Sequence, residues 1–382
     1  MDYAATTSVR EEVLKAMQPY FTLDYANPSS LYEFASESRN AIEIAREEIS
    51  NIINSRRSEI FFTSGGTESN NMAIKGIGLR GNDTGHMITA KTEHHAVLEC
   101  FEQLKNMGWD ITFLDVNSDG TVETSSVIKS LRSDTKLVSL MYINNETGAI
   151  NDIKSIAKGI DSFSKKNNTN VIFHTDAVQA VGKLKIDVKE LGVDMLSISA
   201  HKIHGPKGVG MLFIKKGTEL VPLISGGGQE NNLRSGTENV PSIVGLGIAM
   251  KFADEERDFL YKKMYEFQQK FLIGIQKISK NYKLNGDIKN KIPSIINFSF
   301  PNVQGEPLIL GLDFKGILAS SGSACSSASV EPSHVLTSMG ISRDDAVGSL
   351  RLSMGRETTD KDIDSTLIAL ENVLNQLNSM ST

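Results

Sequence analysis

Five polar or glycine-rich clusters follow runs of apolar residues that are typical of β-strands, and each carries a group capable of chemistry. In a sheet of parallel strands covered by helices, ligands bind beyond the carboxyl ends of the strands. The spacing therefore predicts that the five clusters gather at one edge of one sheet. They are SGGTESNN (64–71), KTEHHAVLE (91–99), MYINNETG (141–148), HTDAVQ (174–179) and SISAHKIHGPKGVG (197–210).

Three of these clusters predict groups that hold an aldehyde cofactor. Gly66 and Thr67 open a helical stretch, where free backbone N–H groups and the positive end of the helix dipole favour a phosphate. Lys202 follows an apolar strand, and a lysine in such a place can form a Schiff base, with His201 beside it as a possible phosphate contact. Asp176 ends another apolar strand, where a carboxylate needs a partner such as a positively charged nitrogen.

Together, these groups match what pyridoxal phosphate (PLP) requires. They supply a phosphate cradle, a Schiff-base lysine and an acid for the pyridine nitrogen, and the flat ring of His94 could stack on the pyridine. Each cluster also has a plainer interpretation by itself. The glycines could form an ordinary helix N-cap, His94 could be a capping or packing residue, and Asn145 and Glu146 could form a polar turn. The coincidence of all five clusters predicts a PLP site.

The two cysteines of the chain have different surroundings. Cys100 lies on a helical face with Val97, Phe101 and Leu104, which is typical of a small buried residue. Cys325 lies in SSGSACSSAS (320–329), whose small side chains cannot pack a core and predict an exposed, mobile loop. A mobile thiol beside PLP-bound cysteine could attack the substrate sulfur, which would leave a persulfide on Cys325 and release alanine.

Arg351 is the candidate for binding the substrate carboxylate. It lies in the apolar segment SLRLSMGR (349–356), and a guanidinium suits bidentate capture of an α-carboxylate. A structural ion pair is the alternative interpretation.

The elements that must position these residues follow an α/β pattern. Short β-rich runs alternate with helical patterns between residues 40 and 250, which predicts a mostly parallel sheet covered by helices. After residue 250 a long charged helix, a short strand and a final amphipathic helix predict a smaller α+β domain. We expect a large PLP-binding domain at 12–255, and a small domain formed by 1–11 and 256–382 that carries the cysteine loop.

Composition excludes several classes of protein. The net charge of −6 argues against a broad nucleic-acid surface, and no apolar run approaches the roughly 20 residues that span a bilayer. The first residues lack the basic and apolar regions of a signal peptide. Two cysteines cannot form a disulfide framework or a four-cysteine metal site. We therefore expect a cytoplasmic protein that binds neither nucleic acid nor membrane and contains no metal.

The chain resembles the cysteine desulfurases of the NifS/IscS type, which are class V, fold-type I PLP enzymes with a seven-stranded sheet. The resemblance runs nearly end to end, and its most specific segments are SAHKIHGPKGVG, GGGQENNLRSGTENV, SSGSACSSASVEPSHVL and SLRLSMGR. The resemblance implies specific roles for individual residues.

Lys202 would bind the cofactor covalently, Asp176 would contact its pyridine nitrogen, Gln179 would contact its ring hydroxyl, and His94 would stack on the ring and transfer protons. The phosphate would be held by Gly66, Thr67, Ser199 and His201, with Thr237 of a second subunit. The substrate would be bound by Asn145, which also contacts the cofactor, and by Arg351 and Asn27, and the persulfide would form on Cys325.

The same resemblance implies a homodimer that uses L-cysteine and passes sulfur to an iron–sulfur scaffold or a thiolation acceptor. Two departures from the family pattern are Leu31-Tyr32, near a position where a histidine is common, and Asn231-Asn232, where a basic residue is common. A selenocysteine lyase, a PLP aminotransferase and a non-catalytic binding module remain as alternatives, and an aminotransferase would not need Cys325.

Overall fold

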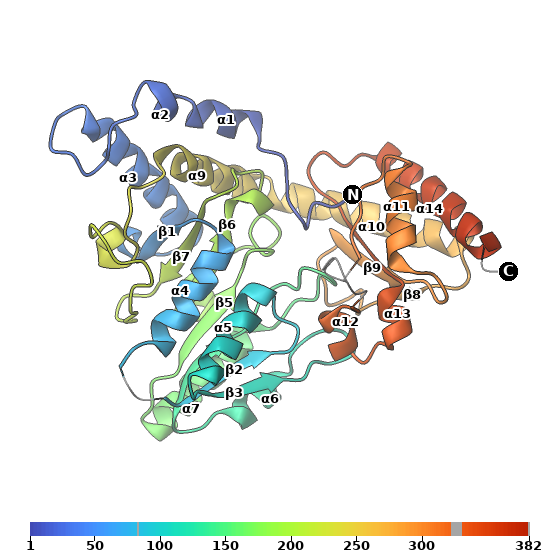
Figure 1. The fold of residues 1–382 in the computed structure, drawn as a ribbon, viewed down its shortest axis with the longest axis horizontal. Coiled ribbons are helices and arrows are strands. Elements are labelled where there is room, and N and C mark those ends of the chain that lie inside the picture. Colours follow the sequence, from blue (N-terminus) through green and yellow to red (C-terminus); the bar gives the residue numbers. More distant parts are fainter. Residues whose placement is uncertain (82–83, 322–330, 381–382) are drawn as a thin grey trace.

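The computed structural model describes residues 1–81, 84–321 and 331–380, and its strands and helices alternate along most of the chain (Figure 1). The strands are β1 (Ile60–Thr63), β2 (His86–Ala90), β3 (Asp110–Leu114), β4 (Thr135–Ser139), β5 (Ile172–Asp176), β6 (Met195–Ser199), β7 (Gly210–Ile214), β8 (Lys283–Leu284), β9 (Ile295–Ser299) and β10 (Ser349–Ser353). The helices are α1 (Glu11–Met17), α2 (Pro19–Thr22), α3 (Ala35–Ile52), α4 (Gly66–Gly78), α5 (His95–Asn106), α6 (Thr124–Ser130), α7 (Ile153–Asn167), α8 (Val188–Leu191), α9 (Val240–Glu255), α10 (Arg257–Ile278), α11 (Gly305–Asp313), α12 (His334–Ser338), α13 (Arg343–Val347) and α14 (Asp360–Met380), with short 3-10 turns η1 (Arg57–Glu59), η2 (Ala200–Lys202) and η3 (Glu230–Asn232).

A seven-stranded sheet forms the larger part of the molecule, in the order β1-β7-β6-β5-β4-β2-β3. Strands β2 to β6 pair in parallel, and β7 alone runs against its neighbours β1 and β6. The prediction of a mostly parallel seven-stranded sheet is therefore confirmed. Because β1, β4, β5 and β6 run in the same direction, their carboxyl ends lie along one edge.

Both faces of this sheet are buried, since neighbouring residues of a strand point to opposite sides. Phe61 of β1 and Leu137 of β4 pack in the core under α4 and α5, whereas Phe62 and Val138 pack in the core that α3, α7 and α9 cover. This burial on both sides explains why the strands read as continuous apolar runs and not as alternating ones.

A second, three-stranded antiparallel sheet has the order β10-β9-β8. Its core is formed with α10, α11 and α14 and includes Phe271, Phe298 and Leu370. The first residues of the chain join this part, because Met1 packs against the same core and Asp2 pairs with Ser353 at the end of β10. The amino-terminus thus lies beside the carboxyl-terminal part, as Figure 1 shows.

The long charged helix predicted after residue 250 is in fact two helices. Helix α9 ends at Glu255 and α10 begins at Arg257. Glu256 lies between them, and its carboxylate pairs with Arg10 at 2.8 Å and with Arg356 at 3.3 Å. These contacts are made with distant parts of the chain, so the local helical pattern gives no sign of the break. Within the described residues, no helix has both the length and the apolarity to cross a membrane.

Candidate active site

The predicted clusters meet where parallel strands of the larger sheet end. Beyond Ser139 the chain still follows β5, because Leu140 N donates to His174 O at 3.1 Å and Tyr142 N donates to Asp176 O at 2.9 Å. This pairing carries the 141–148 segment past the end of β5. The neighbouring strand β6 ends at Ser199 and leads directly into the turn that holds Lys202.

Lys202 is held by the first residues of the chain. Its Nζ donates to the carbonyl oxygens of Ala4 at 2.6 Å and Ala5 at 2.7 Å. Burial lowers the pKa of Lys202 to about 8; the positive charge of Arg351 lowers it further, while Asp2 and Asp176 oppose the shift. Part of this amine is therefore neutral near neutral pH, which is the form that attacks a carbonyl carbon.

Asp176 is buried at the carboxyl end of β5. Its Oδ2 accepts a hydrogen bond from Asn70 Nδ2 at 2.6 Å, and its Oδ1 accepts from Val178 N at 2.9 Å. No described residue forms an ion pair with Asp176, so the positively charged partner that the sequence predicts is not supplied by that part of the chain. Each carboxylate oxygen keeps a lone pair for a further donor.

His94 is both a helix cap and a member of the site. Its Nδ1 accepts from Ala96 N at 3.0 Å at the start of α5, which places the proton of the neutral ring on Nε2. Desolvation lowers the pKa of His94, Asp176 raises it and Lys202 lowers it. The three side chains therefore lie within electrostatic reach of one another, although His94 as a whole residue remains exposed.

The start of α4 forms a cradle with free donors. No described residue accepts a hydrogen bond from the backbone N–H groups of Gly66 and Thr67. A Cβ at Gly66 would lie 2.8 Å from Val178 Cγ2 and 3.5 Å from Ser199 Cβ, so glycine keeps this space open. His201 lies nearby with its Nδ1 3.1 Å from Thr6 Oγ1, and burial lowers its pKa to about 4, which keeps the ring neutral.

Arg351, in the middle of β10, connects the smaller sheet to this site. Its Nη1 donates to Asn145 O at 3.0 Å and its Nη2 to Asp2 Oδ1 at 3.0 Å, while its buried Nε has no partner among the described residues. An unpaired buried donor on a guanidinium is a ready contact for a carboxylate.

Gln179 lies against the amino-terminal segment. Its Nε2 donates to Ala4 O at 3.0 Å, the same carbonyl that accepts from Lys202. Asn27 and Thr237 are exposed on separate loops, and neither hydrogen-bonds another predicted site residue within the described chain.

Cys325 lies outside the described residues. On the amino-terminal side of its segment, Ser320 pairs through its backbone with Arg351, at 2.7 Å and 3.2 Å. On the other side, Ser333 Oγ donates to Glu146 Oε2 at 2.5 Å, and His334 Nε2 lies 2.9 Å from Glu93 O. Both flanks are thus attached to residues that adjoin the site.

Sequence reasoning missed the residues that hold the site together. They share a partner far away in the chain, and they are Asp2, Asn70, Glu93, Glu146 and Ser333. All of them except the half-buried Asp2 are buried. Their only signal in the sequence is that they are polar residues inside the motifs themselves.

The residues present fit PLP. The open cradle with free N–H donors, the lysine of lowered pKa, the acid with spare lone pairs and the unpaired Arg351 Nε supply what its phosphate, aldehyde, pyridine nitrogen and a bound carboxylate need. No group of three or more His, Cys, Asp or Glu residues suited to a metal occurs within the described part of the chain.

Comparison with known proteins gives one consistent result. The aminotransferase class-V family matches residues 1–366. The chain is 48% identical to "Cysteine desulfurase IscS" of Dictyoglomus turgidum over 382 residues, which cover 100% of this chain and 95% of that protein. Among solved structures, a "NifS-like protein" shares 36% identity with a TM-score of 0.91 over 98% of both chains. The structure "SspA in complex with cysteine" shares 36% identity with a TM-score of 0.79, over 92% of this chain and 97% of that one.

Both the family match and these relatives extend over nearly the whole chain, including every predicted site residue. Enzymes of this family depend on PLP, which agrees with the fit of the site. The chain therefore belongs to the class-V aminotransferase family, among the cysteine desulfurases of the IscS type.

Proposed function

We propose that this chain is a PLP-dependent cysteine desulfurase that converts L-cysteine to L-alanine and carries the released sulfur as a persulfide on Cys325. The observation that carries the proposal is the attachment of both flanks of the Cys325 segment to the site. Ser320 pairs with Arg351, Ser333 bonds Glu146, and Arg351 in turn binds the backbone of Asn145. A relative of known structure was solved in complex with cysteine, which supports the substrate.

The reaction balances without an external oxidant. The Cβ–S bond of L-cysteine breaks, a C–H bond forms at that carbon, and an S–S bond forms between the substrate sulfur and Cys325. L-cysteine and one enzyme thiol thus give L-alanine and one enzyme persulfide. When bound, the cofactor withdraws electrons from the substrate Cα and so makes its substituents labile.

The residues of the chain bind the reactants and move protons. Arg351 binds the α-carboxylate through its unpaired Nε, with Asn145 beside it and Asn27 as a further contact. Lys202 supplies an amine that is partly neutral at neutral pH, and the Asp176 carboxylate would hold a proton on the pyridine nitrogen. His94 would stack on the cofactor ring, and its Nε2 would be the atom that exchanges a proton, because Nδ1 is engaged with Ala96 N.

The remaining predicted residues bind the cofactor's polar groups. Gln179 contacts the ring hydroxyl. The phosphate is held by Gly66, Thr67, Ser199 and His201, and by Thr237 of a second subunit. Thr237 is exposed and separate from the other site residues within one chain, which supports a homodimer in which it completes the partner's site.

We further propose the cellular setting and the division of the chain. Sulfur passes from Cys325 to an iron–sulfur scaffold or a thiolation acceptor in the cytoplasm. The two separate sheets and their cores support a large domain at 12–255 and a small domain of 1–11 with 256–382.

The chain's two cysteines provide a matched test of the proposal. The holoenzyme is incubated with L-cysteine and a thiol reductant, and alanine and sulfide are measured for the wild type, Cys325→Ala and Cys100→Ala. We expect Cys325→Ala to lose both products and Cys100→Ala to retain them, because burial raises the pKa of the Cys100 thiol to about 11. Sulfide formation that persists in Cys325→Ala contradicts the proposal. Keto-acid formation by this variant would instead indicate an aminotransferase.

A further inference from the structure

A partly open cavity adjoins the active site but is not the cofactor site. It lies between the amino-terminal segment, the α9–α10 junction and the start of β9, and Lys202 is the one predicted cofactor residue in its wall. The space open to the centre of a water molecule is ≈ 90 Å³, about six times what one water needs. Most of the wall is apolar, with Val181, Ile203 and Phe252 among its residues.

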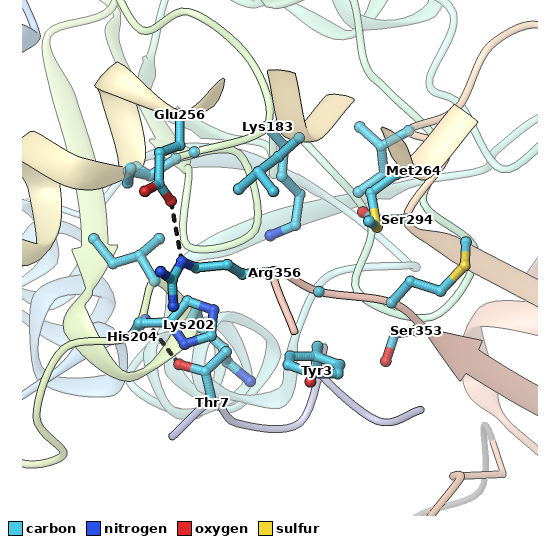
Figure 2. A pocket seen from close by; sticks show the side chains of 18 of the residues that line it. Tyr3, Thr7, Lys183, Lys202, His204, Glu256, Met264, Ser294, Ser353 and Arg356 are labelled. Carbon is cyan, nitrogen blue, oxygen red and sulfur yellow. Dashed lines mark hydrogen bonds and ion pairs between the residues drawn. The ribbon is translucent and has the colours of Figure 1, made fainter. Parts of the chain in front are cut away.

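Lys183 brings an unneutralised cation into this cavity. Figure 2 shows its side chain pointing into the space, with Glu256 and Arg356 to one side and Met264 and Ser294 to the other. The Nζ has one long contact, 3.4 Å to Gln179 Oε1, and no described carboxylate pairs with it. Burial lowers the pKa of Lys183 to about 7, and Lys202 lowers it further. A buried cation without an anion is costly, so this site favours an anionic ligand.

The other charged groups around the cavity already have partners among the described residues. Lys202 Nζ donates to the carbonyl oxygens of Ala4 and Ala5. The Glu256 carboxylate lies between Arg10 and Arg356, at 2.8 Å and 3.3 Å. His204 Nδ1 lies 3.1 Å from Ser8 O, and desolvation lowers its pKa, so the ring is neutral near neutral pH. Burial raises the pKa of Tyr3 to about 12, so its hydroxyl is neutral as well.

A second polar group in the wall lacks a partner. Ser294 Oγ is buried, lines the same cavity and has no hydrogen-bond partner among the described residues. The wall thus combines one free cation, one free hydroxyl and a mainly apolar surface. This chemistry matches a small organic anion with an aliphatic tail better than it matches a bare inorganic ion.

We propose that this cavity binds a small aliphatic monocarboxylate, with the carboxylate paired to Lys183 and the tail against the apolar wall. The cavity communicates with the catalytic lysine through a short relay. Lys183 contacts Gln179 Oε1, Gln179 Nε2 donates to Ala4 O, and that carbonyl also accepts from Lys202. A ligand that draws Lys183 away from Gln179 therefore alters the contacts that fix Lys202.

The test uses isovalerate as the probe and calorimetry on the holoenzyme at a pH slightly below 7. We expect saturable binding with a Kd of about 1 mM or tighter. Lys183→Met should weaken it at least about tenfold, since a charge-assisted hydrogen bond is lost. The matched control Lys185→Met changes an exposed lysine two residues away and should bind like the wild type. Isovaleramide, which has the same shape without the charge, should bind much more weakly.

Two further measurements separate this site from the active site. If isovalerate bound at Arg351, the variant Arg351→Lys would bind it more weakly. If it binds at Lys183, its affinity for Arg351→Lys should equal its affinity for the wild type. Affinity should also fall as the pH rises above 7, because the free Lys183 amine loses its proton while the paired one keeps it. Thermal unfolding shows whether Lys183→Met folds, and isovalerate should stabilise the wild type but not this variant.

The proposal is overturned if isovalerate binding does not saturate at concentrations up to about 10 mM, which is about tenfold above the expected Kd. It is also overturned if Lys183→Met, shown to be folded, binds isovalerate as the wild type does. Neither result bears on desulfurase activity, because no turnover is measured.

Discussion

Replacing Arg351 with lysine tests how the site binds substrate. The guanidinium donates to Asn145 O and Asp2 Oδ1, both at 3.0 Å, and its buried Nε, which has no partner in the described part of the chain, is available to a substrate carboxylate. A lysine in Arg351→Lys keeps the charge but presents one ammonium on a flexible stem, which cannot make these three contacts in their planar arrangement.

The expected loss follows from the contact that is removed. A hydrogen bond to a charged group contributes about 1.5 to 3 kcal/mol, which corresponds to about 10- to 100-fold in kcat/KM for L-cysteine. Because the carboxylate takes no part in the chemistry, we expect the loss mainly as a higher KM.

Cysteamine, which lacks the α-carboxylate, separates substrate binding from structural damage. The assay compares kcat/KM for L-cysteine and cysteamine, with Arg343→Lys, a change at an exposed arginine of α13, as the control. For Arg351→Lys, the ratio of kcat/KM for L-cysteine to kcat/KM for cysteamine should fall by the same factor as kcat/KM for L-cysteine itself. Arg343→Lys should leave this ratio unchanged. If Arg351→Lys slows both substrates equally, Arg351 is a structural ion-pair residue and does not bind the substrate carboxylate.

Three further predictions concern other parts of the site and its support. Burial raises the pKa of Glu146 to about 7, so the folded state keeps the carboxyl proton between about pH 4.5 and about pH 7 and loses stability as the pH rises through that window. The melting temperature of Glu146→Gln, which keeps an acceptor for Ser333, should lack this decline, and parallel plots of melting temperature against pH for the two proteins would contradict it. Gly66→Ala should release PLP faster than the wild type, because the added Cβ would lie 2.8 Å from Val178 Cγ2 and narrow the cradle. Equal rates of cofactor dissociation for the variant and the wild type, followed by absorbance, would exclude Gly66 as a residue that keeps the cradle open. Burial lowers the pKa of His174 to about 3, so the free energy of unfolding falls as the pH drops below 6.5, by about 2 kcal/mol at pH 5. Urea titrations of His174→Gln should show most of this loss removed, and an unchanged acid dependence of the unfolding free energy would argue against this role of His174.

The sequence predicts the chemistry of the site better than its support. Asp176 and Lys202 are recognisable because each follows an apolar strand, and the end of a strand is a local feature of the sequence. The partners of such residues are not local. Asn70 reaches Asp176 from 106 positions away, and Asp2 reaches Arg351 from 349 positions away. Only the path of the chain through both sheets decides these pairs.

His94 and Glu256 show two other limits of the sequence. A helix cap and a site residue are alternative interpretations of His94 in the sequence, yet one ring nitrogen caps α5 while the other has no partner among the described residues and is available to the site. The break between α9 and α10 coincides with ion pairs from Glu256 to Arg10 and Arg356, which no helical periodicity records.

Sulfur should leave the substrate on one particular thiol, that of Cys325, and a single-turnover experiment shows whether it does. The holoenzyme is mixed with one equivalent of L-cysteine without reductant, alanine is quantified, and peptide mass spectrometry locates the added sulfur atom. We expect one persulfide on Cys325 for each alanine and none on Cys100. Alanine formed while Cys325 remains an unmodified thiol, or sulfur found on Cys100 instead, would contradict it.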